Sequence, residues 1–447
     1  MAGRRFQKQL EQFLPVWAEK GWITPGAQAD ILAHAAARPA THRFGYAVGI
    51  LGVLLLGSGV ITFFAANWDQ MARLSKLALL FGSLWLSYGI AAYLRSAAGL
   101  PNLGEALLLL GVLLFGANVM LIAQIYHVDA HYPNGILMWA IGGLLTAWLL
   151  NSQAAMIAAL LLGILWTLVE HVGFGEVHWA YLVFAAVSAL LIERRDWYRS
   201  AHLLCIGLML WAVTVYDVRD LAARDAVFLT QCFLLVALGL FFAAALPVSQ
   251  RVVPTLAGPV RRYAMLGALI TLFLLTMPHL QQGGRWLSWE AGLVAPSPVW
   301  PPLTLALALL VGALVVLRQR SVVVTPHAGL GLVLLVLLLA LVVANLFLDG
   351  NRAGLAALGF NIVFFASTVW LVFAGLEQRD QVMLNLAFGF FTLGLVARYF
   401  DTFWTLMDRS LFFLAGGTVL LVGGYFLERQ RRRLARKIAI GRGEEVA

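Results

Sequence analysis

Uncharged apolar runs of about 20 residues recur along this chain, and each has the length that an α-helix needs to cross a ~30 Å hydrocarbon core. Lipid offers no hydrogen-bond partners to the backbone, so such segments must form helices or a closed barrel. A barrel strand would alternate apolar and polar residues over ~10 positions, whereas blocks such as residues 332–344 do not alternate. The pattern therefore predicts an all-α, polytopic transmembrane helix bundle.

The apolar runs predict about 14 transmembrane spans, by their length and spacing. The expected spans cover residues 44–66, 74–95, 103–125, 135–150, 154–171, 177–192, 201–217, 226–247, 262–278, 299–317, 322–347, 354–376, 381–398 and 410–427. A transmembrane domain at 44–427 thus follows a polar segment at 1–43 and precedes a basic tail at 428–447.

The first 43 residues carry a different pattern from the apolar runs. Apolar residues at helical spacing, from Phe6 to Trp17, predict a helix that ends at Gly21. Thr24 and Pro25 then fit the N-cap and first positions of a second short helix. Residues 1–43 are predicted to form a cytoplasmic helical hairpin. It either rests on the membrane or the loops, or serves as a regulatory or partner-docking module.

Basic residues indicate how the chain is oriented, because they are retained on the cytoplasmic side of a membrane. With a cytoplasmic N-terminus, the segments predicted to face the cytoplasm hold 23 of the 31 basic residues. Acidic residues divide evenly between the two sides, so the asymmetry lies in the cations alone. Both termini are therefore predicted to be cytoplasmic. The basic cluster at 429–437 is either a topology anchor or a site for anionic lipid headgroups or a protein partner.

Composition agrees with a membrane location. Charged residues make up 12% of the chain, about half of the ~25% found in an average soluble protein. The net charge of +9 has a topological explanation, so no nucleic-acid partner is expected. Cys205 and Cys232 both fall inside apolar spans and are interpreted as packing residues rather than as a disulfide. The first apolar run begins after a polar segment too long for a signal peptide.

Two stretches of the chain carry a family resemblance. They are Phe63-Phe64-Ala65-Ala66-Asn67-Trp68-Asp69, and Leu114-Phe115-Gly116-Ala117-Asn118 followed by Leu121-Ile122-Ala123-Gln124-Ile125-Tyr126-His127. With the short helical N-terminus, these motifs resemble the bacterial membrane-protein family known only as domain of unknown function 2157, over about residues 10–155. The resemblance implies a protein of the bacterial inner (cytoplasmic) membrane. It implies no catalytic residues, because the family has no established activity.

Polar side chains gather at the predicted outer ends of the spans. No Lys, Arg, Asp or Glu lies near the centre of a predicted span, which disfavours an ion-coupled transporter and a flippase for polyprenyl pyrophosphates. Gln124 and His127 are three residues apart, which would place them on one helical face. Short turns join the first three spans, so we expect one ligand-binding site from residues of the first outer turn and the third span. Its residues are Asn67, Asp69, Arg73, Gln124 and His127.

Other outer turns repeat this polar character. Asn361, Arg398 and Asp401 are among their residues. The shared pattern is either a degenerate repeat of helical hairpins or the usual preference of short turns for Asn, Asp and Arg as caps. Histidines are concentrated in two outer loops, as His127-x-Asp129-x-His131, and as Glu170-His171 with Glu176-x-His178. Such residues could bind Zn²⁺ or form interfacial hydrogen bonds. The spacing is not a recognised zinc signature, so no metal and no cofactor are expected.

Three functions stay open at this point. The first is binding, transport or assembly support for a lipid or glycan of the cell envelope, through a polar site near the outer leaflet. The second is a membrane-embedded hydrolase or transferase acting on an envelope lipid, with an acid–base pair from the outer polar residues. The third is a sensor whose output is the N-terminal hairpin. Membrane lipids are the expected partners, and the sequence gives no oligomeric state.

Overall fold

The computed structural model describes residues 14, 17–24, 27, 28, 30, 31, 71–127, 131–175, 178–216, 223–277, 326–347, 353–403, 417, 418, 421–425 and 428–430. The chain divides into two compact units, Met1–Gly82 and Ser83–Ala447. All regular structure in the described residues is helical.

The described N-terminal residues have the features expected of a helical hairpin. Gly21 adopts a positive φ of 74°, and the Trp22 N–H donates to the Trp17 carbonyl at 2.9 Å, which is the pattern of a helix C-terminus. The Gln28 side chain donates to the Leu14 carbonyl at 3.3 Å. Because Leu14 lies before the turn and Gln28 after it, this bond joins the two predicted arms. The separation of 1–43 as a domain stays a prediction.

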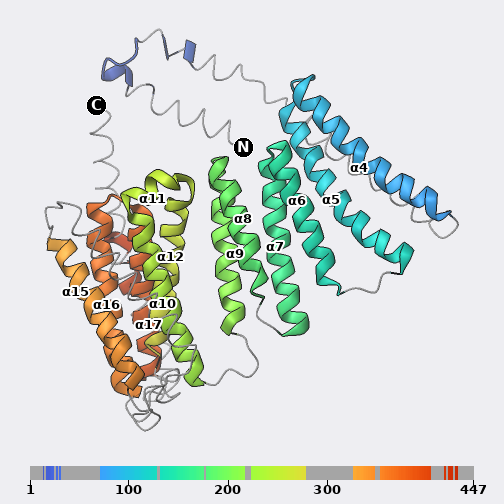
Figure 1. The fold of residues 1–447 in the computed structure, drawn as a ribbon. Coiled ribbons are helices and arrows are strands. Elements are labelled where there is room, and N and C mark those ends of the chain that lie inside the picture. Colours follow the sequence, from blue (N-terminus) through green and yellow to red (C-terminus); the bar gives the residue numbers. More distant parts are fainter. Residues whose placement is uncertain are drawn as a thin grey trace. The chain divides into compact units, whose positions relative to one another are not determined.

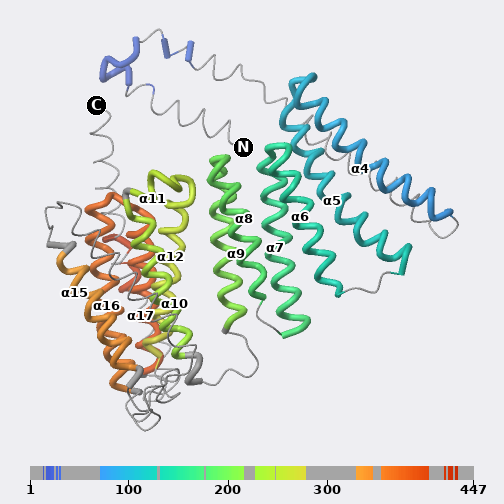
Figure 2. Tube along the Cα trace, in the orientation of Figure 1, coloured from blue at the N-terminus to red at the C-terminus, as the bar shows by residue number. Residues whose placement is uncertain are grey.

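Twelve helices are described in full (Figures 1 and 2). They are α4 (Arg73–Ser96), α5 (Pro101–Tyr126), α6 (Pro133–Leu150), α7 (Gln153–Phe174), α8 (Ala180–Arg194), α9 (Tyr198–Tyr216), α10 (Ala223–Ala245), α11 (Pro247–Val252), α12 (Pro254–Leu275), α15 (Pro326–Phe347), α16 (Ala353–Glu377) and α17 (Gln381–Phe403).

Nine of these helices are long and apolar enough to cross a membrane, counted over the described residues. They are α4, α5, α6, α7, α9, α10, α12, α16 and α17. Nine of the predicted spans are therefore confirmed as helices of sufficient length and apolar character. The spans expected at 44–66 and 299–317 lie outside the described residues, as does most of 410–427. The total of fourteen and the cytoplasmic termini stay predictions.

Two elements differ from the predicted spans. The span expected at 177–192 corresponds to α8, a helix of 15 residues, which is about 22 Å long at 1.5 Å per residue and falls short of the ~30 Å core. The span expected from residue 262 begins earlier, at Pro254. Pro254 has the fixed φ that suits a first helical position. The helix therefore begins about two turns before the charged pair Arg261 and Arg262.

The helices from α5 to α9 share one apolar core. Its fully buried side chains include Val112, Ala140, Met156 and Tyr181. Trp139 of α6 lies across Gly116 of α5, and its indole N–H donates to the Val112 carbonyl at 2.7 Å. Small residues let helix backbones approach closely in a membrane, where packing replaces the hydrophobic effect as the main attraction.

A second core joins α10, α12, α15, α16 and α17. Leu234, Leu275, Phe360 and Phe364 are almost completely buried in it. Ala374, Met383 and other residues of α12, α16 and α17 form a neighbouring apolar cluster. These helices position two features described below, a polar cluster around Arg398 and an apolar groove.

At the predicted cytoplasmic end of α4–α7, one ion pair joins four helix ends. Arg95 lies 3.5 Å from the Glu105 carboxylate and donates to the Leu150 carbonyl at 2.6 Å. The second Glu105 oxygen accepts a hydrogen bond from the Ser152 hydroxyl at 2.5 Å. The same hydroxyl accepts from the Ala155 N–H and so caps α7. The interaction therefore satisfies groups that would otherwise be unpaired at the ends of α6 and α7.

The α8–α9 turn meets the start of α12 through a second set of carboxylates. Glu193 accepts hydrogen bonds from the backbone N–H groups of Thr255 and Leu256, at 3.2 and 3.0 Å. Asp196 accepts from the Thr255 hydroxyl at 2.7 Å. A carboxylate at a helix N-terminus satisfies unpaired N–H groups and complements the positive end of the helix dipole.

Candidate functional site

The structure describes three of the five residues predicted to form an outer ligand site. Asn67 and Asp69 lie outside the described residues. Arg73 is an exposed residue at the start of α4, within the first compact unit. Gln124 and His127 are exposed at the end of α5, within the second unit. The joint site stays a prediction.

One premise of that site needs correction. Gln124 and His127 were expected to share a helical face, but α5 ends at Tyr126. His127 follows in the left-handed conformation, with φ 51° and ψ 45°, and its N–H bonds the Ala123 and Gln124 carbonyls. His127 is therefore the residue that ends the helix, and the three-residue spacing no longer fixes where its side chain points.

The best-formed polar group lies at the predicted outer end of these helices, and we call it the outer polar cluster. Its residues are His131, Glu170, Thr167 and His178. The His131 Nε2 lies 3.0 and 2.9 Å from the two Glu170 carboxylate oxygens. The side chains are 37% and 20% exposed, so the pair can meet a ligand without being fully solvated. His131 precedes α6 and Glu170 lies one turn before the end of α7, and packing of these two helices brings them together.

His178 forms the more buried part of the outer polar cluster. Its Nδ1 lies 3.2 Å from the fully buried Thr167 hydroxyl. Its ring meets the Trp166 ring edge-on at 4.0 Å between centroids, and its carbonyl accepts from the Trp211 indole at 2.9 Å. Burial lowers the pKa of His178 below its usual 6.5, and the negative charge of Glu170 opposes this effect. The lowered pKa favours the neutral imidazole at pH 7. In the tautomer that carries its proton on Nε2, the Nδ1 atom accepts the Thr167 hydrogen.

Aromatic side chains border the outer polar cluster. Phe174 contacts the His131 ring at 4.2 Å between centroids and is 52% exposed. Trp179 is 61% exposed and packs edge-on against Trp211 at 5.3 Å. Exposed rings beside a polar pair suit the apolar faces and hydroxyl groups of a sugar. They also occur in the aromatic belt of ordinary membrane proteins.

The described residues hold no group of three or more His, Cys, Asp and Glu that could bind a metal ion. Asp129 and Glu176, two of the predicted ligands, lie outside the described residues. His171, the neighbour of Glu170 in sequence, is buried and has a partner of its own. The described geometry thus gives a His–Glu pair with a neighbouring histidine.

The lowered pKa of His178 makes a prediction about stability. Because the unfolded chain binds this proton more tightly than the folded one, stability is fully present above about pH 6.5 and falls as pH drops from there toward the folded pKa. Thermal unfolding in detergent should show a larger decrease in Tm between pH 7.5 and pH 5 for the wild type than for His178→Gln. The difference should be small, because the ring is only partly buried. Equal decreases would contradict the assignment.

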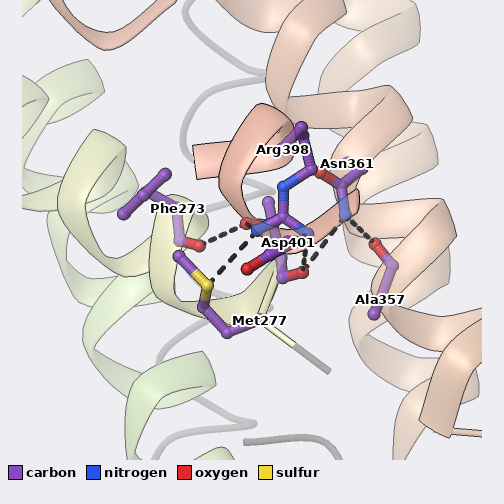
Figure 3. A network of polar contacts seen from close by, with 7 residues as sticks. Phe273, Met277, Ala357, Asn361, Arg398 and Asp401 are labelled. Atoms are coloured by element: carbon purple, nitrogen blue, oxygen red, sulfur yellow. Dashed lines mark hydrogen bonds and ion pairs between the residues drawn. The ribbon is translucent and has the colours of Figure 1, made fainter. Parts of the chain in front are cut away.

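A second polar cluster, the Arg398 cluster, joins the ends of α12, α16 and α17 (Figure 3). Arg398 donates to the Thr276 carbonyl at 3.3 Å, approaches the Met277 sulfur at 3.3 Å and pairs with Asp401 at 3.0 Å. Asn361 donates to the same Thr276 carbonyl at 3.1 Å and to Ala357 at 2.7 Å. The last carbonyls of a helix have no hydrogen-bond donor within the helix. At the end of α12, the side chains of Asn361 and Arg398 donate to the Thr276 carbonyl instead.

The Arg398 cluster is mainly a structural connection. Thr276 is 1% exposed, and the positive guanidinium faces the negative end of the α12 dipole. Asp401 is 48% exposed, so only this edge of the cluster is open to a ligand. Neither Thr276 nor Met277 was singled out from the sequence, because a buried threonine at a helix end has no distinctive pattern. The outer polar cluster therefore offers the more complete set of binding groups.

The helices and their polar ends define a multi-pass α-helical membrane protein. Residues 15–156 match the family described as "Predicted membrane protein (DUF2157)", which confirms the resemblance seen in the sequence motifs. The match covers α4 to α6 and reaches the start of α7, so it includes Gln124, His127 and His131 but not Glu170. Searches of curated proteins and of solved structures gave no significant match.

Proposed function

We propose that this protein binds the headgroup of a glycan-bearing lipid of the bacterial cell envelope, at the outer polar cluster. The observation that carries the proposal is the His131–Glu170 pair, at 2.9 Å and partly exposed, beside the exposed rings of Phe174 and Trp179. A carboxylate accepts hydrogen bonds from sugar hydroxyls, an imidazole donates or accepts, and aromatic rings pack against the apolar face of a sugar.

The same proposal includes the location of the site. The excess of basic residues in the alternate loops supports an inner-membrane protein with cytoplasmic termini. With this orientation, the α5–α6 and α7–α8 loops would lie outside. A cysteine at exposed Asn134 should then react with a membrane-impermeant maleimide in intact cells, whereas one at Arg195 should react only after lysis. The native Cys205 is buried and Cys232 is partly buried, so the unsubstituted chain should give little background labelling.

A hydrolase or transferase is the second candidate function. It is favoured by the same contact, because a carboxylate that orients an imidazole is the usual support of a general base. The described part of the cluster supplies one hydroxyl, Thr167, which is fully buried and already lies 3.2 Å from His178. The described geometry therefore supports binding better than nucleophilic catalysis.

Binding can be tested with monoglucosyl diacylglycerol in nanodiscs, by native mass spectrometry of the full chain. We expect His131→Ala and Glu170→Gln each to weaken binding about tenfold, the effect of losing one hydrogen bond to a charged group. His202→Ala is the matched control, because His202 contacts Tyr198 and Tyr263 at the other end of α9 and α12. Unchanged binding in both cluster variants would reject the site. Conversion of the lipid by the wild type would favour the enzyme.

A further inference from the structure

An apolar groove lies between α10, α12, α15 and α16, away from the outer polar cluster. It has a volume of about 80 Å³. Its lining is almost entirely aliphatic and aromatic, and only Ser367 and the Trp370 indole add polar atoms. The lining residues are Leu234, Leu238, Phe241, Phe242, Met265, Ala268, Leu269, Leu272, Gly331, Leu334, Leu335, Leu338, Ser367, Trp370 and Leu371.

The dimensions of the groove match part of one membrane leaflet. Its lining runs from residue 265 to 272 on α12 and from 234 to 242 on α10, which is about 10–12 Å at 1.5 Å per residue. Half of the ~30 Å hydrocarbon core is ~15 Å. Water does not fill an apolar cavity of this kind, so a hydrocarbon chain is the chemically matched occupant at this depth.

The guanidinium group of Arg261 lies at one end of the groove. The Arg261 guanidinium lies 5.5 Å from the centre of the Phe241 ring, and Phe241 lines the groove. Met265, another lining residue, is four positions after Arg261 and so lies on the same face of α12. The charged group and the apolar groove are therefore adjacent, about 6 Å apart along the helix axis.

Arg261 has donors available for an anion. Among the described residues, its one hydrogen bond goes to the side-chain oxygen of Gln378, a neutral and exposed group. A guanidinium carries five N–H donors and binds phosphate with two of them in parallel. Asp380 is near enough to act on Arg261 electrostatically. However, its Oδ1 atom already accepts from the backbone N–H groups of Val382 and Met383, at 2.9 and 3.3 Å.

We propose that this groove binds one anionic phospholipid, with an acyl chain between α10, α12, α15 and α16 and its phosphate at Arg261. Charge complementarity selects the headgroup, and the apolar lining selects the chain. Arg261 lies at the end of α12 where basic residues predominate, so the lipid belongs to the predicted cytoplasmic leaflet. This site is separate from the outer polar cluster and does not depend on the glycan-lipid proposal.

The site can be tested with the full chain in detergent, by native mass spectrometry with phosphatidylglycerol and with zwitterionic phosphatidylcholine of the same chains. Arg261→Gln should weaken phosphatidylglycerol binding about tenfold. It should weaken phosphatidylcholine binding less, because phosphatidylcholine has the same phosphate but its choline cation leaves the headgroup without net charge. Ser367→Phe should weaken both lipids, because the ring fills the groove. Arg195→Gln removes the same charge from the α8–α9 turn and should change neither.

A second measurement uses only the wild-type protein, so it still tests the proposal if a variant folds poorly. Phosphatidylglycerol with a diazirine at the end of one acyl chain, in nanodiscs with the wild type, should label peptides that contain 234–242 and 265–272. Labelling confined to other helices would overturn the proposal, and it would mean that another segment of this chain or a second copy covers the groove. Equal phosphatidylglycerol affinity for the wild type and Arg261→Gln, with both monodisperse, would also overturn it.

Discussion

Replacing Gly116 with leucine should separate α5 from α6 and lower stability by about 3–5 kcal/mol, the range reached when a core is overpacked and a buried hydrogen bond is lost. A Cβ atom at Gly116 would lie 2.1 Å from the Trp139 ring, so the indole must move. Its bond to the Val112 carbonyl, 2.7 Å long, would then break. Thermal unfolding in detergent, followed by circular dichroism, would measure the loss.

Gly89→Leu is the matched control for this substitution. Gly89 lies in α4 and is exposed, and a Cβ atom added there would meet no other atom within 4 Å. The control should change stability by less than about 1 kcal/mol, as expected for an exposed helix position. Adding Trp139→Leu to Gly116→Leu should restore part of the loss by making room. If both glycine variants are equally stable, the close approach of α5 and α6 is not as described.

Replacing Arg398 with methionine should lower stability by about 1–3 kcal/mol, the cost of losing a hydrogen bond between a charged group and a buried carbonyl. Methionine keeps the aliphatic length of the side chain and removes the guanidinium. The Thr276 carbonyl would keep only the Asn361 bond, and Asp401 would lose its partner. Unfolding by denaturant in detergent would report the change.

Lysine and asparagine variants distinguish the parts of this network. Arg398→Lys should recover some stability but not all of it. Nη1 of Arg398 contacts the Thr276 carbonyl and Asp401, whereas Nη2 contacts the Thr276 hydroxyl and the Met277 sulfur, and a single ammonium cannot occupy both positions. Asp401→Asn should cost less than about 1 kcal/mol, because Asp401 is 48% exposed and such ion pairs are weak. A larger loss for Asp401→Asn than for Arg398→Met would show that the surface pair, rather than the helix end, holds α17.

Hydrophobic length alone predicted most of the helices, because a lipid environment leaves the backbone few alternatives. Helix ends were less predictable. With Pro254 at its first position, α12 starts eight residues before the predicted boundary at residue 262. The left-handed conformation of His127 ends α5 at Tyr126, so His127 does not share a helical face with Gln124 as predicted. Such ends depend on turn geometry, which hydropathy does not contain.

The two polar clusters show a similar contrast. His131 and Glu170 were both singled out, in two successive loops on the same predicted side, and the structure brings them into contact. Thr276 and Arg398 are 122 residues apart. Their contact depends on which helices pack together, and that choice is not encoded in the local pattern around either residue. Arg261 was counted only as a topology signal, because its neighbour Phe241 lies on another helix.

The ion pair that joins the end of α4 to the start of α5, on the predicted cytoplasmic side, has a consequence for synthesis. Arg95 and Glu105 belong to one hairpin, separated by a short turn, whereas Leu150 and Ser152 belong to the next. As the chain leaves the ribosome, the first hairpin can therefore neutralise its own charges at the membrane surface. The remaining hydrogen-bonding atoms of Arg95 and Glu105 can then bind Leu150 and Ser152 once the α6–α7 hairpin has been inserted. We expect the pair to set the order in which neighbouring hairpins assemble.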